Sequence, residues 1–144
     1  MEEQNFKNHT RWVPSWHFVV YFLVLALIAG ATRNLILACE ANERLYVPVL
    51  LLLTGIVILL VATYARAFAL KAQDRAIRAE ENLRYFAITG KLLDSKLKIG
   101  QIVALRFAPN NEFVELAHRA VQENLSSKEI KLAIQNWKGD HHRV

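Results

Sequence analysis

Residues 46–89 read YVPVLLLLTGIVILLVATYARAFALKAQDRAIRAEENLRYFAIT, and this stretch decides the fold. Pro48 lies in its first turn, and no strong helix breaker follows until Gly90. Residues 46–65 are uncharged and long enough to cross a bilayer, whereas residues 66–89 are charged and amphipathic. A single helix over this stretch would be about 64 Å long. We therefore expect a membrane span that continues into a helix outside the membrane, here called the stalk (residues 66–89).

A second apolar stretch precedes this one and predicts a first span over about residues 15–38. Pro14 suits the first turn of a helix, because its missing amide would have no partner there. A cleaved signal peptide does not fit, since the polar lead of residues 1–13 is long and another span follows closely. Aromatic and basic residues near the span ends predict anchors at the membrane interface: Trp12, Trp16, Tyr21, Arg33 and Tyr46.

Arg33 leaves two interpretations open. It lies about 22 Å along the helix axis from Phe18, near the far side of the hydrocarbon core. Its guanidinium can extend outward to the interface. The alternative is a buried contact with the second span or a partner.

The link between the spans, residues 40–44, is short enough to make them antiparallel. More Lys and Arg residues flank the spans on the side of the chain ends than on the link side. The positive-inside rule therefore predicts a hairpin (residues 14–65) with both termini in the cytoplasm. Thr54 and Gly55 provide a small surface near the middle of the second span, where another helix can approach closely.

Small residues recur along the second span and the stalk at alternating spacings of three and four. This is the a/d repeat of a coiled coil, filled mostly with alanine. We call it the alanine seam: Ala62, Ala65, Ala69, Ala72, Ala76, Ala79, Leu83 and Phe86. It predicts a close helix–helix contact, with the C-terminal part or with another copy, or it reflects only the high helix propensity of a spacer. Acid-first pairs, Asp74 with Arg78 and Glu80 with Arg84, are expected to support the helix in water.

Residues 90–144 predict a small three-helix cap with a short tail. Short helices are expected over residues 98–107 and 112–124, with Asn110 or Asn111 as an N-cap, and after a capping box formed by Ser126 and Glu129. The apolar positions predict one shared core: Phe107, Phe113, Leu116, Ala120, Ile130, Ile134 and Trp137. A domain of so few residues is only marginally stable by itself. We therefore expect the cap to pack against the stalk or against a partner. Arg106 is expected to pair with Glu115 or Asp94.

The chain shows no pattern that predicts catalysis or a cofactor. It has no Gly-rich phosphate loop, no HExxH motif and no CxxC motif. His17 is expected at the membrane interface rather than on haem, and His118 is expected in solvent. Adjacent His141 and His142 in a tail make poor metal ligands. Cys39, the single cysteine, excludes an internal disulfide and has no evident activating base. We therefore predict no enzyme, no metal, no cofactor and no small-molecule substrate.

The net charge of +5 lies after Tyr64, where 14 Lys and Arg residues face 9 Asp and Glu residues. A basic tail can contact nucleic acid or anionic lipid, or it can mark the cytoplasmic side. Because charges of both signs alternate along the cap and no helix has a strongly basic face, nucleic acid is not favoured.

Three short stretches resemble an uncharacterised family of short two-span membrane proteins from Bacteroidetes-type bacteria. They are Gln4-Asn5-Phe6-Lys7-Asn8-His9, Leu105-Arg106-Phe107-Ala108, and the ending from Lys128-Glu129-Ile130-Lys131 to Trp137. The resemblance covers the chain and implies a bacterial inner-membrane location. It implies no activity.

The sequence thus predicts an all-α protein: a transmembrane hairpin, a cytoplasmic stalk continuous with the second span, and a three-helix cap. Its expected role is a non-catalytic accessory subunit or scaffold that contacts membrane lipid and another membrane protein or a second copy of itself. The alternative is a membrane-tethered module whose basic cap binds nucleic acid or anionic lipid. A small transport component is disfavoured, because two spans carry few polar residues to line a path.

Overall fold

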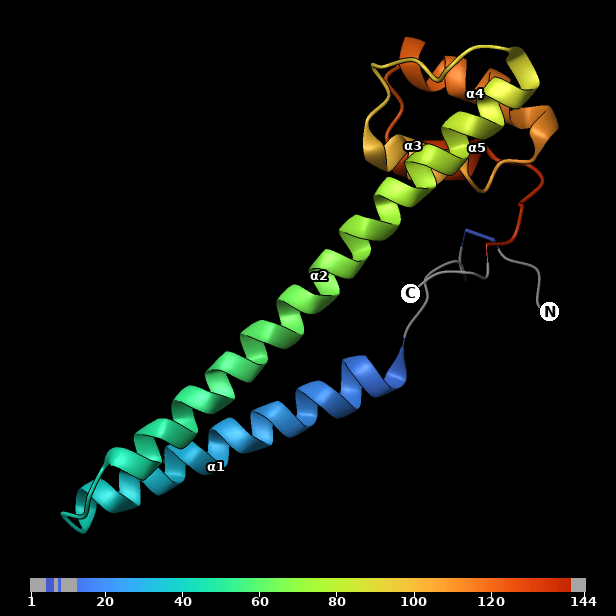
Figure 1. Ribbon diagram of the computed structural model, residues 1–144. Coiled ribbons are helices and arrows are strands. Elements are labelled where there is room, and N and C mark those ends of the chain that lie inside the picture. The colour runs from blue at the N-terminus through green and yellow to red at the C-terminus, as the bar shows by residue number, and fades with distance from the viewer. Residues whose placement is uncertain (1–4, 7, 9–12, 141–144) are drawn as a thin grey trace. The chain divides into compact units, whose positions relative to one another are not determined.

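The computed structural model describes residues 5, 6, 8 and 13–140. Trp12, His141 and His142 lie outside these residues. Within the described part every regular element is helical and no strand occurs, which confirms the predicted all-α class. The elements are the π-helix η1 (Ser15–Val20) and the α-helices α1 (Tyr21–Glu40), α2 (Tyr46–Thr89), α3 (Ile99–Leu105), α4 (Asn110–Gln122) and α5 (Ser127–Ala133) (Figure 1).

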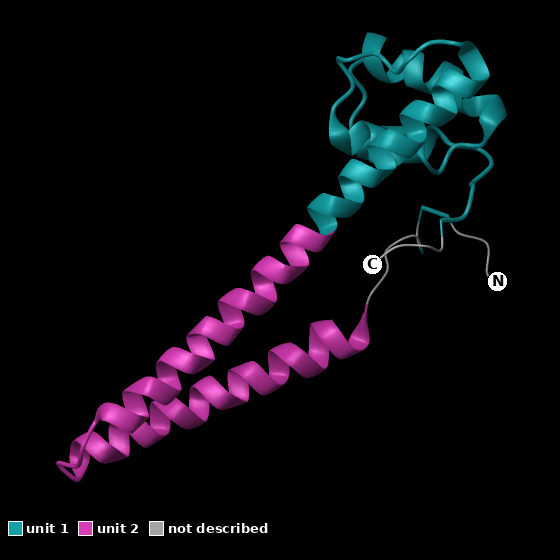
Figure 2. Ribbon diagram, in the orientation of Figure 1, with its two compact units in different colours: residues 1–11, 70–144 teal, residues 12–69 magenta. Residues whose placement is uncertain are grey.

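The chain divides into two compact units, and α2 contributes to both (Figure 2). The hairpin unit comprises residues 12–69, and the cap unit comprises residues 70–144 together with residues 1–11. The uncharged and charged parts of residues 46–89 form one continuous helix, as the absence of a breaker predicts. The helix ends at Thr89, where Gly90 has a φ of 72° and its amide donates to the carbonyl of Phe86 at 2.8 Å. This left-handed residue after the last turn is the helix stop that the glycine predicts.

The hairpin unit contains two helical segments that are long and apolar enough to cross a membrane. They are Ser15–Glu40, formed by η1 and α1, and the apolar part of Tyr46–Thr89. The chain reverses between them at residues 41–45, where Asn42 takes the left-handed conformation with φ 55°. Many of the large apolar side chains of this unit are exposed, among them Phe22, Leu23, Leu53 and Val61.

The buried positions of the hairpin unit recur at every seventh residue on both helices. They are Val24, Ala31 and Ala38 on the first helix and Pro48, Gly55 and Ala62 on the second. A seven-residue repeat keeps one face of each helix toward the other over several turns. A Cβ at Gly55 would lie 2.8 Å from Cγ1 of Ile28, so the missing side chain lets the first helix approach. This is the close approach that Thr54 and Gly55 predict.

The cap unit has one hydrophobic core, which Tyr85 of α2 joins to the three short helices. The ring of Tyr85 meets the ring of Phe113 edge to face, with 5.9 Å between their centroids. The predicted core residues Phe107, Phe113, Leu116, Ala120, Ile130 and Ile134 are buried, and Trp137 is half-buried against them. The C-terminal part of α2 is therefore a fourth side of this core.

The helices of the cap differ from the sequence expectation in two places, the N-cap of α4 and the end of α5. The N-cap of α4 is Pro109, not Asn110 or Asn111, and no side chain caps this helix. The helix α5 opens with the predicted capping box of Ser126 and Glu129. It ends at Ala133, because Ile134 takes an extended conformation, so Trp137 does not continue its apolar face. The segment after α5 instead folds back, and the amide of Lys138 donates to the carbonyl of Phe107 at 2.8 Å.

Candidate functional site

The part of α2 that belongs to the cap unit has one covered face and one open face. Ile77, Glu81 and Tyr85 are buried at successive spacings of four residues. The seam residues lie about half a turn away on the same helix. Ala72, Ala76 and Ala79 are exposed, and Leu83 and Phe86 retain 68% and 48% of their surface. The cap thus packs on the face opposite the alanine seam.

The rest of the seam lies in the hairpin unit, where Ala62 is buried, Ala65 is exposed and Ala69 is half-buried. The cap helices leave the seam residues Ala72, Ala76, Ala79, Leu83 and Phe86 exposed. Of these, Ala76 lines a pocket that it shares with the C-terminal segment. A contact with another chain and a plain spacer both stay predictions for this stretch.

Arg84 joins the covered face of α2 to the start of α4. Its Nη1 donates to Oε2 of Glu81 at 3.0 Å, and its Nη2 donates to the carbonyl of Ala108 at 2.7 Å. Its Nε donates to Oδ1 of Asn110 at 2.8 Å. The sequence predicted a pair with Glu80, but the described part of the chain shows the pair with Glu81. That choice is decided by the cap, because Glu81 faces it and Glu80 is exposed.

Two further polar side chains hold the cap together, and sequence reasoning missed both. Gln101 is buried in α3, where its Nε2 donates to the carbonyls of Ala120 and Leu125 at 3.2 and 2.8 Å. Glu112 lies in the first turn of α4 and accepts hydrogen bonds from the amides of Gln135 and Asn136 at 2.9 and 3.1 Å. An acid in the first turn of a helix is a visible signal in the sequence, but its partners 23 and 24 residues away are not.

The carboxyl of Glu112 is held in its charged form. Partial burial raises its pKa, but the hydrogen bonds from Gln135 and Asn136 outweigh that effect, and the net pKa is lowered. The hydrogen bond to Ser126 likewise lowers the pKa of Glu129. Both carboxylates therefore stabilise the cap while they are ionised.

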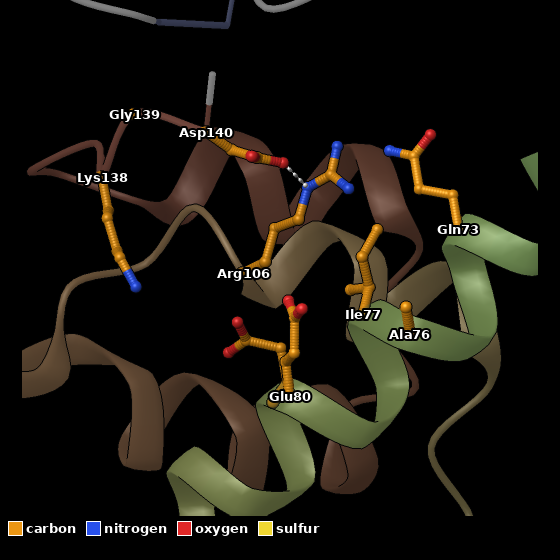
Figure 3. Close-up of a pocket in the computed structure, with 9 residues that line it drawn as sticks. Gln73, Ala76, Ile77, Glu80, Arg106, Lys138, Gly139 and Asp140 are labelled. Atoms are coloured by element: carbon orange, nitrogen blue, oxygen red, sulfur yellow. Dashed lines mark ion pairs between the residues drawn. The ribbon is translucent and has the colours of Figure 1, made fainter. Parts of the chain in front are cut away.

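A pocket of about 500 Å³ lies in the cap unit between α2, the end of α3 and the segment after α5 (Figure 3). Arg106 lies on its wall, and its Nε is 3.2 Å from Oδ2 of Asp140. The predicted partners Glu115 and Asp94 are wrong, because the folded-back C-terminal segment brings Asp140 to this position. The lining residues are Gln73, Ala76, Ile77, Glu80, Glu81, Arg106, Lys138, Gly139 and Asp140.

The chemistry of the pocket does not select a ligand. Two of its carboxylates already have cationic partners, since Glu81 pairs with Arg84 and Asp140 pairs with Arg106. The remaining two charged side chains, Glu80 and Lys138, have opposite signs. Its described lining contains no cysteine, serine or histidine that could act as a nucleophile or base.

The other candidate residues are dispersed. Nδ1 of His17 in η1 lies 2.9 Å from the carbonyl oxygen of Val13, which precedes this helix. His118 is not solely solvated, because its Nε2 lies 3.1 Å from the hydroxyl of Tyr85. Cys39 is exposed at the end of α1. Among the described residues no cluster of three or more His, Cys, Asp or Glu side chains could hold a metal ion.

The predicted membrane anchors are only partly described. Trp16 and Tyr21 are half-buried in the hairpin unit, whereas Arg33 and Tyr46 are exposed. Their role at an interface stays a prediction.

Neither a curated protein nor a solved structure matches the chain. The family of unknown function DUF6526 matches residues 1–144. The expected membership in a family of unknown function is thereby confirmed, and the chain belongs to the DUF6526 family.

Proposed function

We propose that this protein is a non-catalytic membrane protein that acts through protein–protein contact, as an accessory subunit or scaffold. The observation that carries the proposal is the open face of α2. In the cap unit this face presents three exposed alanines, then Leu83 and Phe86, while the cap occupies the opposite face. Small side chains let a second helix approach closely, and burial of the two large apolar side chains against that helix is favoured by the hydrophobic effect.

A membrane location supports this proposal. The hairpin unit exposes apolar side chains along both helices, whereas a soluble monomer rarely exposes an apolar surface of such extent. Lipid is the environment that accommodates it, because both helices satisfy their backbone hydrogen bonds internally. The distribution of Lys and Arg favours cytoplasmic termini, and the family resemblance favours a bacterial inner membrane.

A topology experiment tests the location. In a Cys39→Ser background, a cysteine at Ala41 should react with a membrane-impermeant thiol reagent in intact cells. Ala41 is preferable to Asn42, whose positive φ favours asparagine over cysteine. A cysteine at Lys96, in the loop before α3, should react only after the inner membrane is permeabilised. The opposite pattern would reverse the orientation, and equal reactivity of both sites in intact cells would contradict the spanning hairpin.

Affinity purification in mild detergent tests the contact itself. The full-length protein should co-purify with the same membrane protein, or with a differently tagged copy of itself, in repeated preparations. A variant with Leu83→Ser and Phe86→Ser should lose that partner, while the matched exposed control Leu132→Ser, on the cap surface, should retain it. Equal recovery of the partner by both variants would remove the open face of α2 from the proposal.

The second candidate is a membrane-tethered module whose cap binds nucleic acid or anionic lipid. Its support is the exposed group Lys91, Lys96 and Lys98 in the loop between α2 and α3. Replacement of all three by serine should weaken binding to vesicles containing an anionic lipid if this candidate holds, and it should leave the partner of the first proposal bound. The group is small, and Arg106 and Arg119 are already paired with Asp140 and Glu123. We therefore favour the first candidate.

A further inference from the structure

The seam residues assign a coiled-coil register to α2 beyond the apolar span. Ala69, Ala76 and Leu83 occupy a positions, and Ala72, Ala79 and Phe86 occupy d positions. The same register places Arg75 at a g position and Glu80 at an e position. These two positions flank the seam on either side, where charged residues set the choice and direction of a partner helix.

The residues of α2 that the cap buries do not occupy the a and d positions of this register. The three residues of α2 that it buries are Ile77, Glu81 and Tyr85, which fall at b, f and c. Positions b, c and f point away from the partner in a coiled coil. The cap therefore leaves the a and d positions of residues 72–86 exposed, together with Arg75 at g and Glu80 at e. The other e and g residues, Gln73 and Asn82, are half-buried.

The flanking charges match those of a parallel pair of identical helices. In a parallel coiled coil a g residue of one helix faces the e residue five positions later on the other. Arg75 of one copy would face Glu80 of the second, and two-fold symmetry would form this ion pair twice. Within the described residues neither Arg75 nor Glu80 forms an ion pair in its own chain. Glu80 also lines the pocket beside Arg106, which is paired with Asp140.

We propose that two copies of this chain associate in parallel through the a and d positions of α2 in the stalk, with Arg75 of each copy paired to Glu80 of the other. This inference rests on the proposed function and identifies the partner protein as a second copy of the chain. Parallel association is the direction available to two copies that insert into one membrane with the same orientation. In register, it places Leu83 against Leu83 and Phe86 against Phe86 beyond the small alanine contacts. These two side chains are 68% and 48% exposed in the single chain, and the second copy would bury them.

Cysteine cross-linking in membranes tests the geometry on the full-length protein. In a Cys39→Ser background, Ala72→Cys or Ala79→Cys should form disulfide-linked species at twice the monomer mass under mild catalysed oxidation. Arg78→Cys, at an exposed c position, is the matched control and should cross-link at least tenfold less. Equal cross-linking at positions 72 and 78 would overturn the proposed face.

Charge exchange tests the pair. Arg75→Glu alone or Glu80→Arg alone should lower the fraction of cross-linked dimer, by about fivefold to tenfold in association, because like charges then face each other twice. The double variant Arg75→Glu with Glu80→Arg should restore the original fraction. The pairing would be overturned if the double variant formed no more cross-linked dimer than either single variant.

The outcomes separate this inference from the proposed function. If the cysteines at Ala72 and Ala79 link the chain to a different protein, the contact surface stands and the second copy is wrong. If neither cysteine links to anything and no membrane protein or second copy co-purifies, both proposals fail.

Discussion

The guanidinium carbon of Arg84 lies 4.2 Å from the centroid of the Phe113 ring, so a charged group of α2 is stacked on the core of the cap. The same side chain is only 13% exposed and also contacts Glu81, Ala108 and Asn110. Stacking on an aromatic face combined with a fixed fork of donors is a contact that lysine cannot reproduce.

We predict that Arg84→Lys and Arg84→Ala both destabilise the cap, by about 2 and about 3 kcal/mol. Arg84→Ala leaves the buried Glu81 carboxylate without its partner, whereas Arg84→Lys keeps a cation beside Glu81 but loses the stacking on Phe113 and the donors to Ala108 and Asn110. Limited proteolysis and hydrogen exchange of residues 98–138 would measure the effect. Arg78→Ala, on an exposed position of the same helix, is the control and should change neither reading.

Trp137 should contribute less than a core residue does. It is half-buried in the segment after α5, with its ring centroid 4.9 Å from that of Phe107. Trp137→Ala is therefore expected to cost about 2 kcal/mol. Phe113→Ala, at a fully buried site, should cost about 3–5 kcal/mol. Protease resistance of the cap would rank the two variants, and a larger loss in Trp137→Ala would contradict the observed burial.

The cap should lose stability in acid. The pKa of Glu112 is lower in the folded state than its ordinary value of about 4.5, so its contribution is present above that value and is lost as the pH falls through the folded pKa. Glu112→Gln should cost about 1 kcal/mol at neutral pH and make the cap less sensitive to acid between about pH 5 and pH 3. Hydrogen exchange of residues 134–137 at several pH values would measure this loss of stability and its dependence on pH. Glu115→Gln, an exposed change on the same helix, serves as the control.

A larger side chain in the alanine seam should distinguish a packed helix contact from a plain spacer. If a second helix packs on Ala72, then Ala72→Leu should push the helices apart, at a cost of about 1–3 kcal/mol to the association. If residues 66–89 are only a spacer, leucine should be harmless or even favourable, because it is a good helix former and suits an ordinary d position. The fraction of chain recovered with its partner from detergent distinguishes the two. Lys71→Ala, beside the seam, is the control.

The sequence by itself determined the elements of this protein. The run without breakers from Tyr46 to Gly90 gives one helix, and the Ser126 and Glu129 box starts another. The apolar periodicity identified part of the cap core but not Tyr85 or Leu97. These features depend on neighbours within a few residues, where propensity, capping and periodicity act directly.

Only the tertiary structure decided which groups meet. The stalk carries apolar residues on more than one face, so periodicity could not tell whether the cap would choose the seam or the face of Ile77 and Tyr85. The same holds for Arg106, whose partner Asp140 is brought close by the extended segment after α5. Partners so distant in the chain are selected by packing and by the satisfaction of buried charge, and both exist only once the helices are assembled.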